Sequence, residues 1–312
     1  MGRTKLLQSA YSPSLNRRCL VLVVDSQVHV WPADRSGRRL DEGYRNRPPY
    51  TYETLLTAMD QAGVDCTMLV PPSFDGDRND YALEAASKHP DRFAVMGRVS
   101  LQGGAARAAL ARWKEQPGML GVRLTFHRDT DRPWLTDGTA DWFWPVAERY
   151  AIPVMVHAPE RIATVREIAA RHPGLTIIYD HMGFARETMD GRAMARVQEL
   201  LPLAALANVF VKVSALPCYS TESYPFENLR EPLRKVIEAF GPRRSFWGSD
   251  ITRIPASCSY RQAVTHFTEE LDFLSADDLE WVMGKGLATC LNWHPASAGL
   301  SPVATAAGNY AQ

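Results

Sequence analysis

The chain has 312 residues, of which 46% are hydrophobic and 22% are charged, so it can bury a large core and is not a disordered chain. It holds 35 lysines and arginines against 35 aspartates and glutamates, for a formal net charge of +0. This balance gives neither the basic footprint of a nucleic-acid-binding protein nor the polybasic patch of a protein that binds a membrane surface.

The cysteines and the N-terminal segment indicate a soluble cytoplasmic protein. Five cysteines are scattered along the chain, and none is spaced as Cys-x-x-Cys, which favours reduced thiols over a disulfide framework. No apolar run approaches the length of a membrane span. Residues 1–18 are polar and lack the apolar stretch of a signal peptide, so we expect them to form a flexible N-terminal arm.

Eight short apolar runs recur along the chain, and a longer amphipathic segment follows each of them. Runs of four or five residues with continuous apolar character are typical of parallel strands that are buried on both faces. In chain order, the predicted strands are residues 20–24, 66–70, 93–97, 121–125, 152–156, 176–179, 209–213 and 245–248.

The longer segments have the apolar spacing of helices and stop at residues that end helices. Gly63 follows the first segment, and Pro90 and Pro117 follow the next two. In chain order, the predicted helices are residues 51–62, 79–88, 105–115, 140–150, 162–171, 194–206, 229–240, 260–274 and 276–291.

Alternating strands and helices predict a parallel sheet with right-handed crossovers. Eight strands favour closure into a (β/α)8 TIM barrel over an open sheet, which would need a glycine-rich turn after its first strand. The corresponding turn, residues 25–29, contains no glycine. We therefore expect a single α/β domain, the barrel, over residues 19–296, followed by a C-terminal tail at residues 297–312.

Histidines and one carboxylate stand at the ends of four predicted strands. In a TIM barrel, catalytic groups project from the C-terminal ends of the strands, so side chains at these positions share one rim. We expect four residues to converge there as the catalytic group: His29, His157, His181 and Asp250. Side-chain alternation after the first strand further predicts that Asp25, Gln27 and His29 lie on one face.

Such a group supports two kinds of chemistry. Histidine and aspartate can together hold a divalent cation, usually zinc, which generates hydroxide near neutral pH. The same residues can act as general base and general acid without a metal.

Several motifs, taken in order, make the chain resemble a known family. It is similar to the amidohydrolase superfamily, and within it to amidohydrolase family 2, the branch that includes 2-pyrone-4,6-dicarboxylate lactonase and sugar-lactone hydrolases. The resemblance runs from about Val23 to about His294. The motifs are Asp25-Ser26-Gln27-Val28-His29-Val30-Trp31, Gly121-Val122-Arg123, His157, Asp180-His181-Met182-Gly183, Lys212-Val213-Ser214 and Gly248-Ser249-Asp250.

The resemblance implies roles for the rim residues. The counterpart of Asp250 takes a proton from the attacking water, and the counterpart of His181 contacts the substrate or orients the nucleophile. The family's first strand usually ends in His-x-His, but this chain has Gln27 at the first position. An amide oxygen is a poorer zinc ligand than an imidazole. Two possibilities stay open: a divalent metal, zinc, held by His29, His157 and Asp250, or acid-base catalysis without metal.

The remaining strand ends supply candidates for substrate binding. Arginine forks bind carboxylates, so Arg123 and Arg98, with Lys212, suit either a small cyclic substrate that carries a carboxylate or the anion that forms when a ring carbonyl is attacked. The alternative is that Arg98 or Lys212 is paired with an acidic residue inside the rim. The other candidates are Gln27, Thr125, His127 and Ser214.

The primary hypothesis is hydrolysis of a cyclic ester (lactone) or a cyclic amide by water, with Asp250 as the general base. Non-oxidative decarboxylation of an aromatic acid is an alternative, because related enzymes on this fold catalyse that reaction with a bound metal. A barrel that binds a small ligand without turnover is a third possibility, although retention of both His181 and Asp250 argues against it. Barrels of this branch commonly associate, so a homo-oligomer is also possible.

Overall fold

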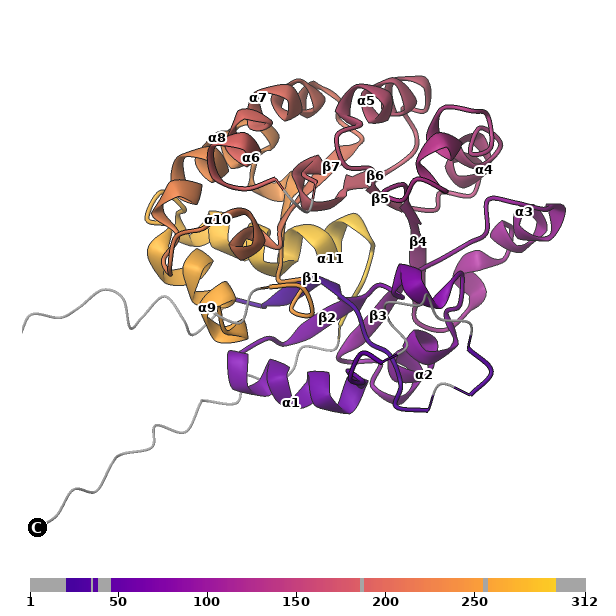
Figure 1. The fold of residues 1–312 in the computed structure, drawn as a ribbon, viewed down its shortest axis with the longest axis horizontal. Helices are drawn as coiled ribbons and strands as arrows, with labels where there is room; N and C mark the ends of the chain where they lie inside the picture. Colours follow the sequence, from indigo (N-terminus) through magenta and orange to yellow (C-terminus); the bar gives the residue numbers. More distant parts are fainter. Residues whose placement is uncertain (1–20, 35, 39–45, 186–187, 255–257, 296–312) are drawn as a thin grey trace, which may run out of the picture.

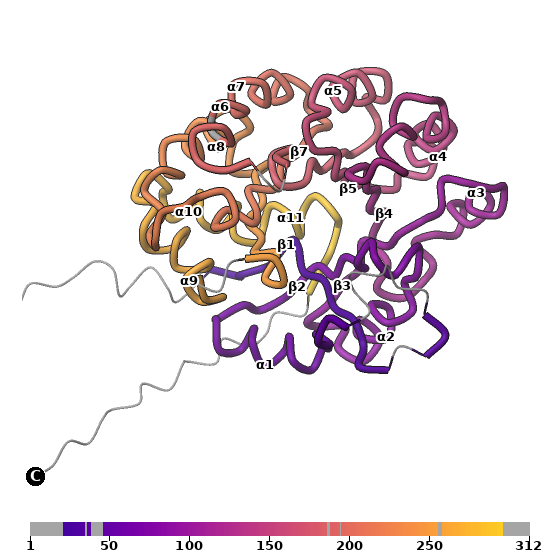
Figure 2. The backbone as a smooth tube through the Cα atoms, in the orientation of Figure 1, coloured from indigo at the N-terminus to yellow at the C-terminus, as the bar shows by residue number. Residues whose placement is uncertain are grey.

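The computed structural model describes residues 21–34, 36–38, 46–185, 188–254 and 258–295. The predicted N-terminal arm, residues 1–18, and the predicted tail, residues 297–312, lie outside the described residues. The strands gather at the centre of the molecule and the helices surround them, which the backbone trace also shows (Figures 1 and 2).

Eight parallel strands form one sheet in sequential order, each paired with the next. The sheet curls so that its two edges meet. The backbone N–H of Asp250, just after the last strand, donates to the carbonyl of Gln27 in the first strand, at 2.9 Å. The predicted (β/α)8 TIM barrel is confirmed. The strands are β1 (Val24–Val28), β2 (Cys66–Leu69), β3 (Phe93–Gly97), β4 (Met119–Thr125), β5 (Val154–His157), β6 (Ile177–Tyr179), β7 (Val209–Ser214) and β8 (Ser245–Gly248).

The helices begin and end at residues with recognisable capping roles. The Thr51 hydroxyl accepts from the Thr54 backbone N–H at the start of the first helix, and Gly63, at φ 79°, ends it. The helices of the described chain are α1 (Tyr52–Ala62), α2 (Asp80–Lys88), α3 (Gly104–Leu110), α4 (Phe143–Arg149), α5 (Ile162–Arg171), α6 (Asp190–Ala195), α7 (Val197–Leu200), α8 (Arg230–Phe240), α9 (Tyr260–Thr265), α10 (Ala276–Glu280) and α11 (Gly286–Cys290).

Two apolar layers hold the barrel together. The larger layer lies between the strands and the helices. The smaller layer fills the inside of the barrel, because alternate residues of successive strands pack against one another there, as in other barrels of this class. Its members include Val24, Met68, Met96, Met155, Ile178 and Phe246.

The first strand does not lie where the apolar run predicted. It spans Val24–Val28 rather than residues 20–24, because pairing with β2 sets its position: Val24 lies opposite Cys66 and Val28 opposite Leu69. The register of this pair is irregular between Asp25 and Val28. An irregularity of this kind breaks the alternation of side chains.

The prediction that Asp25, Gln27 and His29 share one face is therefore wrong. Asp25 accepts from the Tyr260 hydroxyl of α9, at 2.7 Å, whereas Gln27 contacts Lys212 and His29.

Some predicted helices are shorter or broken. Residues 105–115 are α-helical only to Leu110, and a 3₁₀ turn, Trp113–Glu115, follows. The predicted helix at residues 194–206 is divided into the end of α6, the whole of α7 and a 3₁₀ turn, Leu201–Ala205. Pro202 lies at the start of this turn and has no N–H to continue the α-helix.

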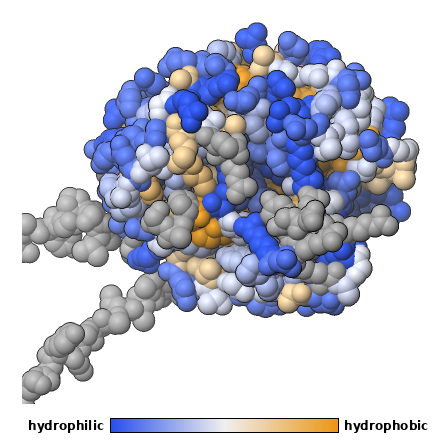
Figure 3. Space-filling view, in the orientation of Figure 1, coloured by the Kyte–Doolittle hydropathy of each residue, from blue (hydrophilic) through white to orange (hydrophobic). Residues whose placement is uncertain are grey.

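The face of the molecule shown in Figure 3 is mainly hydrophilic. Within the described part of the chain, no helix combines the length and the apolar character needed to cross a membrane. The four described cysteines, Cys66, Cys218, Cys258 and Cys290, are free, as the sequence predicted for them.

Candidate active site

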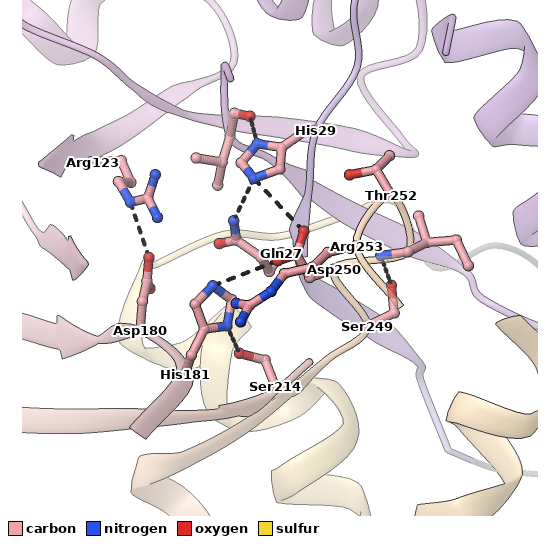
Figure 4. A network of polar contacts seen from close by, with 12 residues as sticks. Gln27, His29, Arg123, Asp180, His181, Ser214, Ser249, Asp250, Thr252 and Arg253 are labelled. Carbon is pink, nitrogen blue, oxygen red and sulfur yellow. Dashed lines mark hydrogen bonds and ion pairs between the residues drawn. The ribbon is translucent and has the colours of Figure 1, made fainter. Parts of the chain in front are cut away.

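Three imidazoles and one carboxylate converge at the C-terminal ends of the strands, as predicted. The two oxygens of Asp250 face different histidines (Figure 4): Oδ1 lies 3.7 Å from Nε2 of His29, and Oδ2 lies 3.7 Å from Nε2 of His181. The ring of His157 lies 5.3 Å from the ring of His181, centroid to centroid. Asp250 Oδ1 is buried and accepts no hydrogen bond from a described residue, so it is available to a water molecule or a substrate.

Hydrogen bonds fix the orientation of His29 and His181. Nδ1 of His29 lies 2.6 Å from the carbonyl oxygen of Val70, which can only accept, so Nδ1 carries the proton. Nε2 of His29 therefore has a lone pair, which accepts from the Gln27 amide at 3.2 Å. Nδ1 of His181 lies 2.8 Å from the hydroxyl of Ser214.

Burial keeps the imidazoles neutral near pH 7. The pKa values of His29, His157 and His181 all lie below 6.5, chiefly because burial disfavours the charged ring. Nearby cations lower these pKa values further: Arg123 for His157, and Arg253 first for His181.

A buried ion triad lies beneath the imidazoles. Asp180 receives Lys212 on one oxygen, with Nζ at 2.9 Å, and Arg123 on the other, with Nε at 3.0 Å. Lys212 also donates to the Gln27 side-chain oxygen, at 2.6 Å. The structure thus pairs Lys212 with an acidic residue inside the rim, the alternative that the sequence left open.

A second group of predicted residues, Arg98, Thr125 and His127, lies at the C-terminal ends of the strands, the mouth of the barrel. Arg98 donates to the Thr125 hydroxyl and to the Gly76 carbonyl, each at 2.9 Å, and lies 3.9 Å from Asp77. Burial and the neighbouring Arg123 lower the pKa of the Arg98 guanidinium to about 10. The ring of His127 lies 5.5 Å from that of His157.

His127 is neutral for the same reason as the other histidines. Burial, with Arg123 next, lowers its pKa to about 4. Nδ1 of His127 and Nδ1 of His157 are both buried and have no hydrogen-bond partner in the described structure. The mouth therefore contains ring nitrogens that are open to a ligand.

The backbone is strained at two of the four converging residues. His181 has φ 52° and Asp250 has φ 49°, the left-handed region that non-glycine residues seldom adopt. Each such residue costs about 1–3 kcal/mol and persists only where its surroundings fix it.

Asp25 fixes the turn that carries Asp250. It accepts from the Ser249 backbone N–H at 2.9 Å and from the Ser249 hydroxyl. Burial raises the pKa of Asp25 to about 6, and the hydrogen bonds from Ser249 act in the opposite direction.

Sequence reasoning missed three residues of this neighbourhood. Asp180 was part of a recognised motif, and its position before His181 at a strand end was the signal that could have found it. Asp25 was assigned to the wrong face. Arg253 lies in the loop after β8, where no strand register predicts the direction of a side chain.

The comparisons with known proteins identify the family. The amidohydrolase family model (Amidohydro_2) matches residues 24–285. The chain belongs to this amidohydrolase family. The family predicted from the motifs is confirmed, and with it the prediction that the chain is a hydrolase.

Individual relatives of this amidohydrolase have related activities. A protein named L-fucono-1,5-lactonase, from Burkholderia ambifaria, is 30% identical over 243 residues, which cover 73% of this chain and 79% of that protein. The structure of a putative 2-pyrone-4,6-dicarboxylic acid hydrolase from Pseudomonas putida is 26% identical with a TM-score of 0.68, covering 88% of this chain and 99% of that chain.

Members of the family typically depend on a divalent metal. An amidohydrolase structure from Burkholderia multivorans contains bound zinc, and it has a TM-score of 0.72 at 22% identity, covering 87% of this chain and 99% of that chain. At that identity the likeness shows the fold alone.

The residues of this chain fit a divalent metal poorly. Among the described residues, no three His, Cys, Asp or Glu side chains are arranged to hold one. Nε2 of His29, the lone pair that would bind the metal, instead accepts from the Gln27 amide. The Lys212 ammonium lies against the same amide and adds a competing positive charge.

The ion triad predicts that replacing Asp180 destabilises the fold more than replacing Lys212. Lys212→Met leaves Asp180 paired with Arg123, whereas Asp180→Asn leaves two buried cations without a counter-charge. We expect Asp180→Asn to lower the free energy of unfolding by about 3–5 kcal/mol, and Lys212→Met to lower it by less. Urea denaturation followed by circular dichroism measures both.

The surface ion pair of Lys235 with Glu231 provides the matched control, because Lys235→Met removes an exposed partner at 3.7 Å. This substitution should change the free energy of unfolding by less than about 1 kcal/mol. A Lys212→Met variant that is less stable than Asp180→Asn would contradict the shared-carboxylate arrangement.

Proposed function

We propose that this amidohydrolase is a lactonase that opens a small cyclic ester with water. The observation that carries the proposal is the position of Asp250, whose oxygens each face a neutral imidazole while Oδ1 remains without a hydrogen-bond partner. The relatives named as a lactonase and as a pyrone hydrolase support it. A cyclic amide is the alternative substrate, because attack on its ring carbonyl needs the same groups.

The chemistry begins with the attacking water. Asp250 takes a proton from this water through Oδ1, the carboxylate oxygen that has no hydrogen-bond partner in the described structure. The water oxygen bonds to the ring carbonyl carbon, and negative charge develops on the carbonyl oxygen. His157, whose Nδ1 is open, supplies a ring N–H to that oxygen.

The ring then opens. The bond between the carbonyl carbon and the ring oxygen breaks, and the proton held by Asp250 passes to the departing oxygen. The product is an open-chain hydroxy acid, and Asp250 is ionised again for the next cycle. A barrel that only binds a ligand would have no use for a buried carboxylate kept free of hydrogen bonds.

The reaction proceeds without a resident metal in this proposal. The Gln27 amide donates to the lone pair of His29, and the Lys212 ammonium supplies a fixed positive charge next to the Gln27 side chain. No step above requires another cation.

Replacement of the general base tests the proposal directly. We expect Asp250→Asn to lower kcat for lactone hydrolysis by about 10²–10⁴-fold, because the amide cannot accept the proton of the water. A pH-indicator assay over a panel of lactones that includes L-fucono-1,5-lactone measures the rates, and circular dichroism checks the fold.

Asp272→Asn is the control, because Asp272 lies on the surface with 74% of its side chain exposed. This variant should hydrolyse the panel at the wild-type rate. Wild-type turnover by Asp250→Asn would remove Asp250 from the mechanism. Release of carbon dioxide from an aromatic acid, with no lactone opened, would favour decarboxylation instead.

Chelation tests the role of metal. We expect dialysis against EDTA to leave kcat/KM unchanged, with metal content followed by plasma emission spectroscopy before and after. Activity that is lost on dialysis and restored by stoichiometric zinc would contradict the metal-free proposal.

The pH profile should reflect the neutral histidines. Protonation of His29 would break its hydrogen bond from Gln27 and place a positive charge beside the Asp250 carboxylate, so activity should fall as the pH drops through the lowered histidine pKa values. Because these pKa values lie below 6.5, the acid limb of kcat/KM should be centred below pH 6.5. Initial rates corrected for spontaneous hydrolysis give the profile, and an acid limb centred above pH 6.5 would conflict with neutral, buried imidazoles.

A further inference from the structure

The guanidinium of Arg253 lies near the Asp250 carboxylate and against Tyr219. The backbone N–H of Arg253 donates to the Asp250 carbonyl at 2.7 Å, so both residues belong to one turn. Figure 4 shows the side chain between Asp250 and His181, and its charge acts on both of them. The ring of Tyr219 lies beneath it, 5.2 Å from the guanidinium carbon to the ring centroid.

Two donors of this guanidinium have no partner. Nε and Nη2 of Arg253 are buried, and neither donates a hydrogen bond within the described structure. Buried charged donors are costly to leave unpaired, so an unpaired set calls for a ligand that satisfies it. Nε and Nη2 form one edge of the guanidinium, and the spacing of the two N–H groups on this edge matches the two oxygens of a carboxylate.

The acidic residues of the site do not meet this demand. Asp180 is shared between Lys212 and Arg123. Asp250 is close enough to influence Arg253, but its oxygens face His29 and His181, and Oδ1 accepts nothing. An incoming carboxylate would therefore meet an open cationic edge next to the general base.

We propose that Arg253 binds a carboxylate group of the substrate next to the reacting carbonyl, and thereby selects lactones that carry a carboxylate over neutral lactones. This inference rests on the proposed lactonase activity. It assigns to Arg253 a substrate-binding role, and it gives the turn that carries Asp250 and Arg253 a function in specificity.

Arg234 is a second arginine whose Nε makes no hydrogen bond in the described structure, but it lies far from the strand ends, on α8. Its Nε is buried but lies 3.7 Å from Glu231, and its guanidinium stacks on Phe273 at 5.0 Å in the outer helix α8, where 39% of the Arg234 side chain is exposed. Solvent can satisfy the rest of its guanidinium there. Arg234→Gln therefore serves as the matched control.

The test compares two lactones that differ in one ring substituent, which is charged in one and apolar in the other. 5-Oxotetrahydrofuran-2-carboxylate carries a carboxylate on the ring, and γ-valerolactone carries a methyl group at the same place. We expect wild type to favour the carboxylate, and Arg253→Gln to lower kcat/KM for it on the order of 100-fold, mainly through KM, so that the preference disappears. Arg253→Lys keeps the charge but loses the fork, and should lose about 10-fold.

The outcomes separate the roles that Arg253 could have. Equal losses of kcat for both lactones in Arg253→Gln would place Arg253 at the oxyanion instead and overturn the inference. Unchanged selectivity in both Arg253 variants would overturn it as well. Arg234→Gln should keep the wild-type preference, and thermal denaturation of each variant checks that the fold is intact.

A binding measurement keeps this inference separate from the proposed activity. Calorimetry with 5-oxotetrahydrofuran-2-carboxylate compares Asp250→Asn with the double variant Asp250→Asn and Arg253→Gln. If wild type opens neither lactone but only the single variant binds the carboxylate, the lactonase proposal fails and the role of Arg253 stands. Equal binding by both variants, or by neither, would overturn the role of Arg253.

Discussion

The shared carboxylate of Asp180 is the interaction on which the site depends. Asp180 follows β6 and neutralises Arg123 from β4 and Lys212 from β7 inside the barrel, where an unpaired charge would be very costly. Lys212 then positions the Gln27 amide, which donates to His29, and His29 in turn faces Asp250. The ion triad that joins β4, β6 and β7 therefore also sets the orientation of His29 beside the proposed general base, Asp250.

Backbone strain accompanies this arrangement. His181 and Asp250 both adopt left-handed conformations, and these conformations direct their side chains toward each other across the mouth. Neighbouring bonds oppose relaxation: Asp25 holds Ser249, and the Gln27 carbonyl holds the Asp250 backbone N–H. Both of these bonds start from the part of β1 whose register is irregular, so a local irregularity of the strand accompanies the geometry of the site.

Strand order and the converging residues could be predicted because both follow from simple rules. Buried parallel strands are apolar runs, and strand ends in a barrel share one rim, which placed His29, His157, His181 and Asp250 together. The face of Asp25 could not be predicted, because a register irregularity depends on pairing with another strand. The direction of Arg253 could not be predicted either, because a loop after the last strand has no periodicity.

The cations of the mouth show why residue type alone does not assign a role. Lys212 and Arg123 stand at strand ends and look from the sequence like anion-binding groups, but the fold commits the Lys212 ammonium and the Arg123 Nε to Asp180. Arg253 has no such commitment for Nε and Nη2 in the described structure. A barrel needs paired charges to keep its interior stable, whereas a binding site needs donors that only the ligand can satisfy. The hydrogen-bond state of each cation, rather than its position along a strand, therefore separates the residues that build this site from the residue proposed to recognise the substrate.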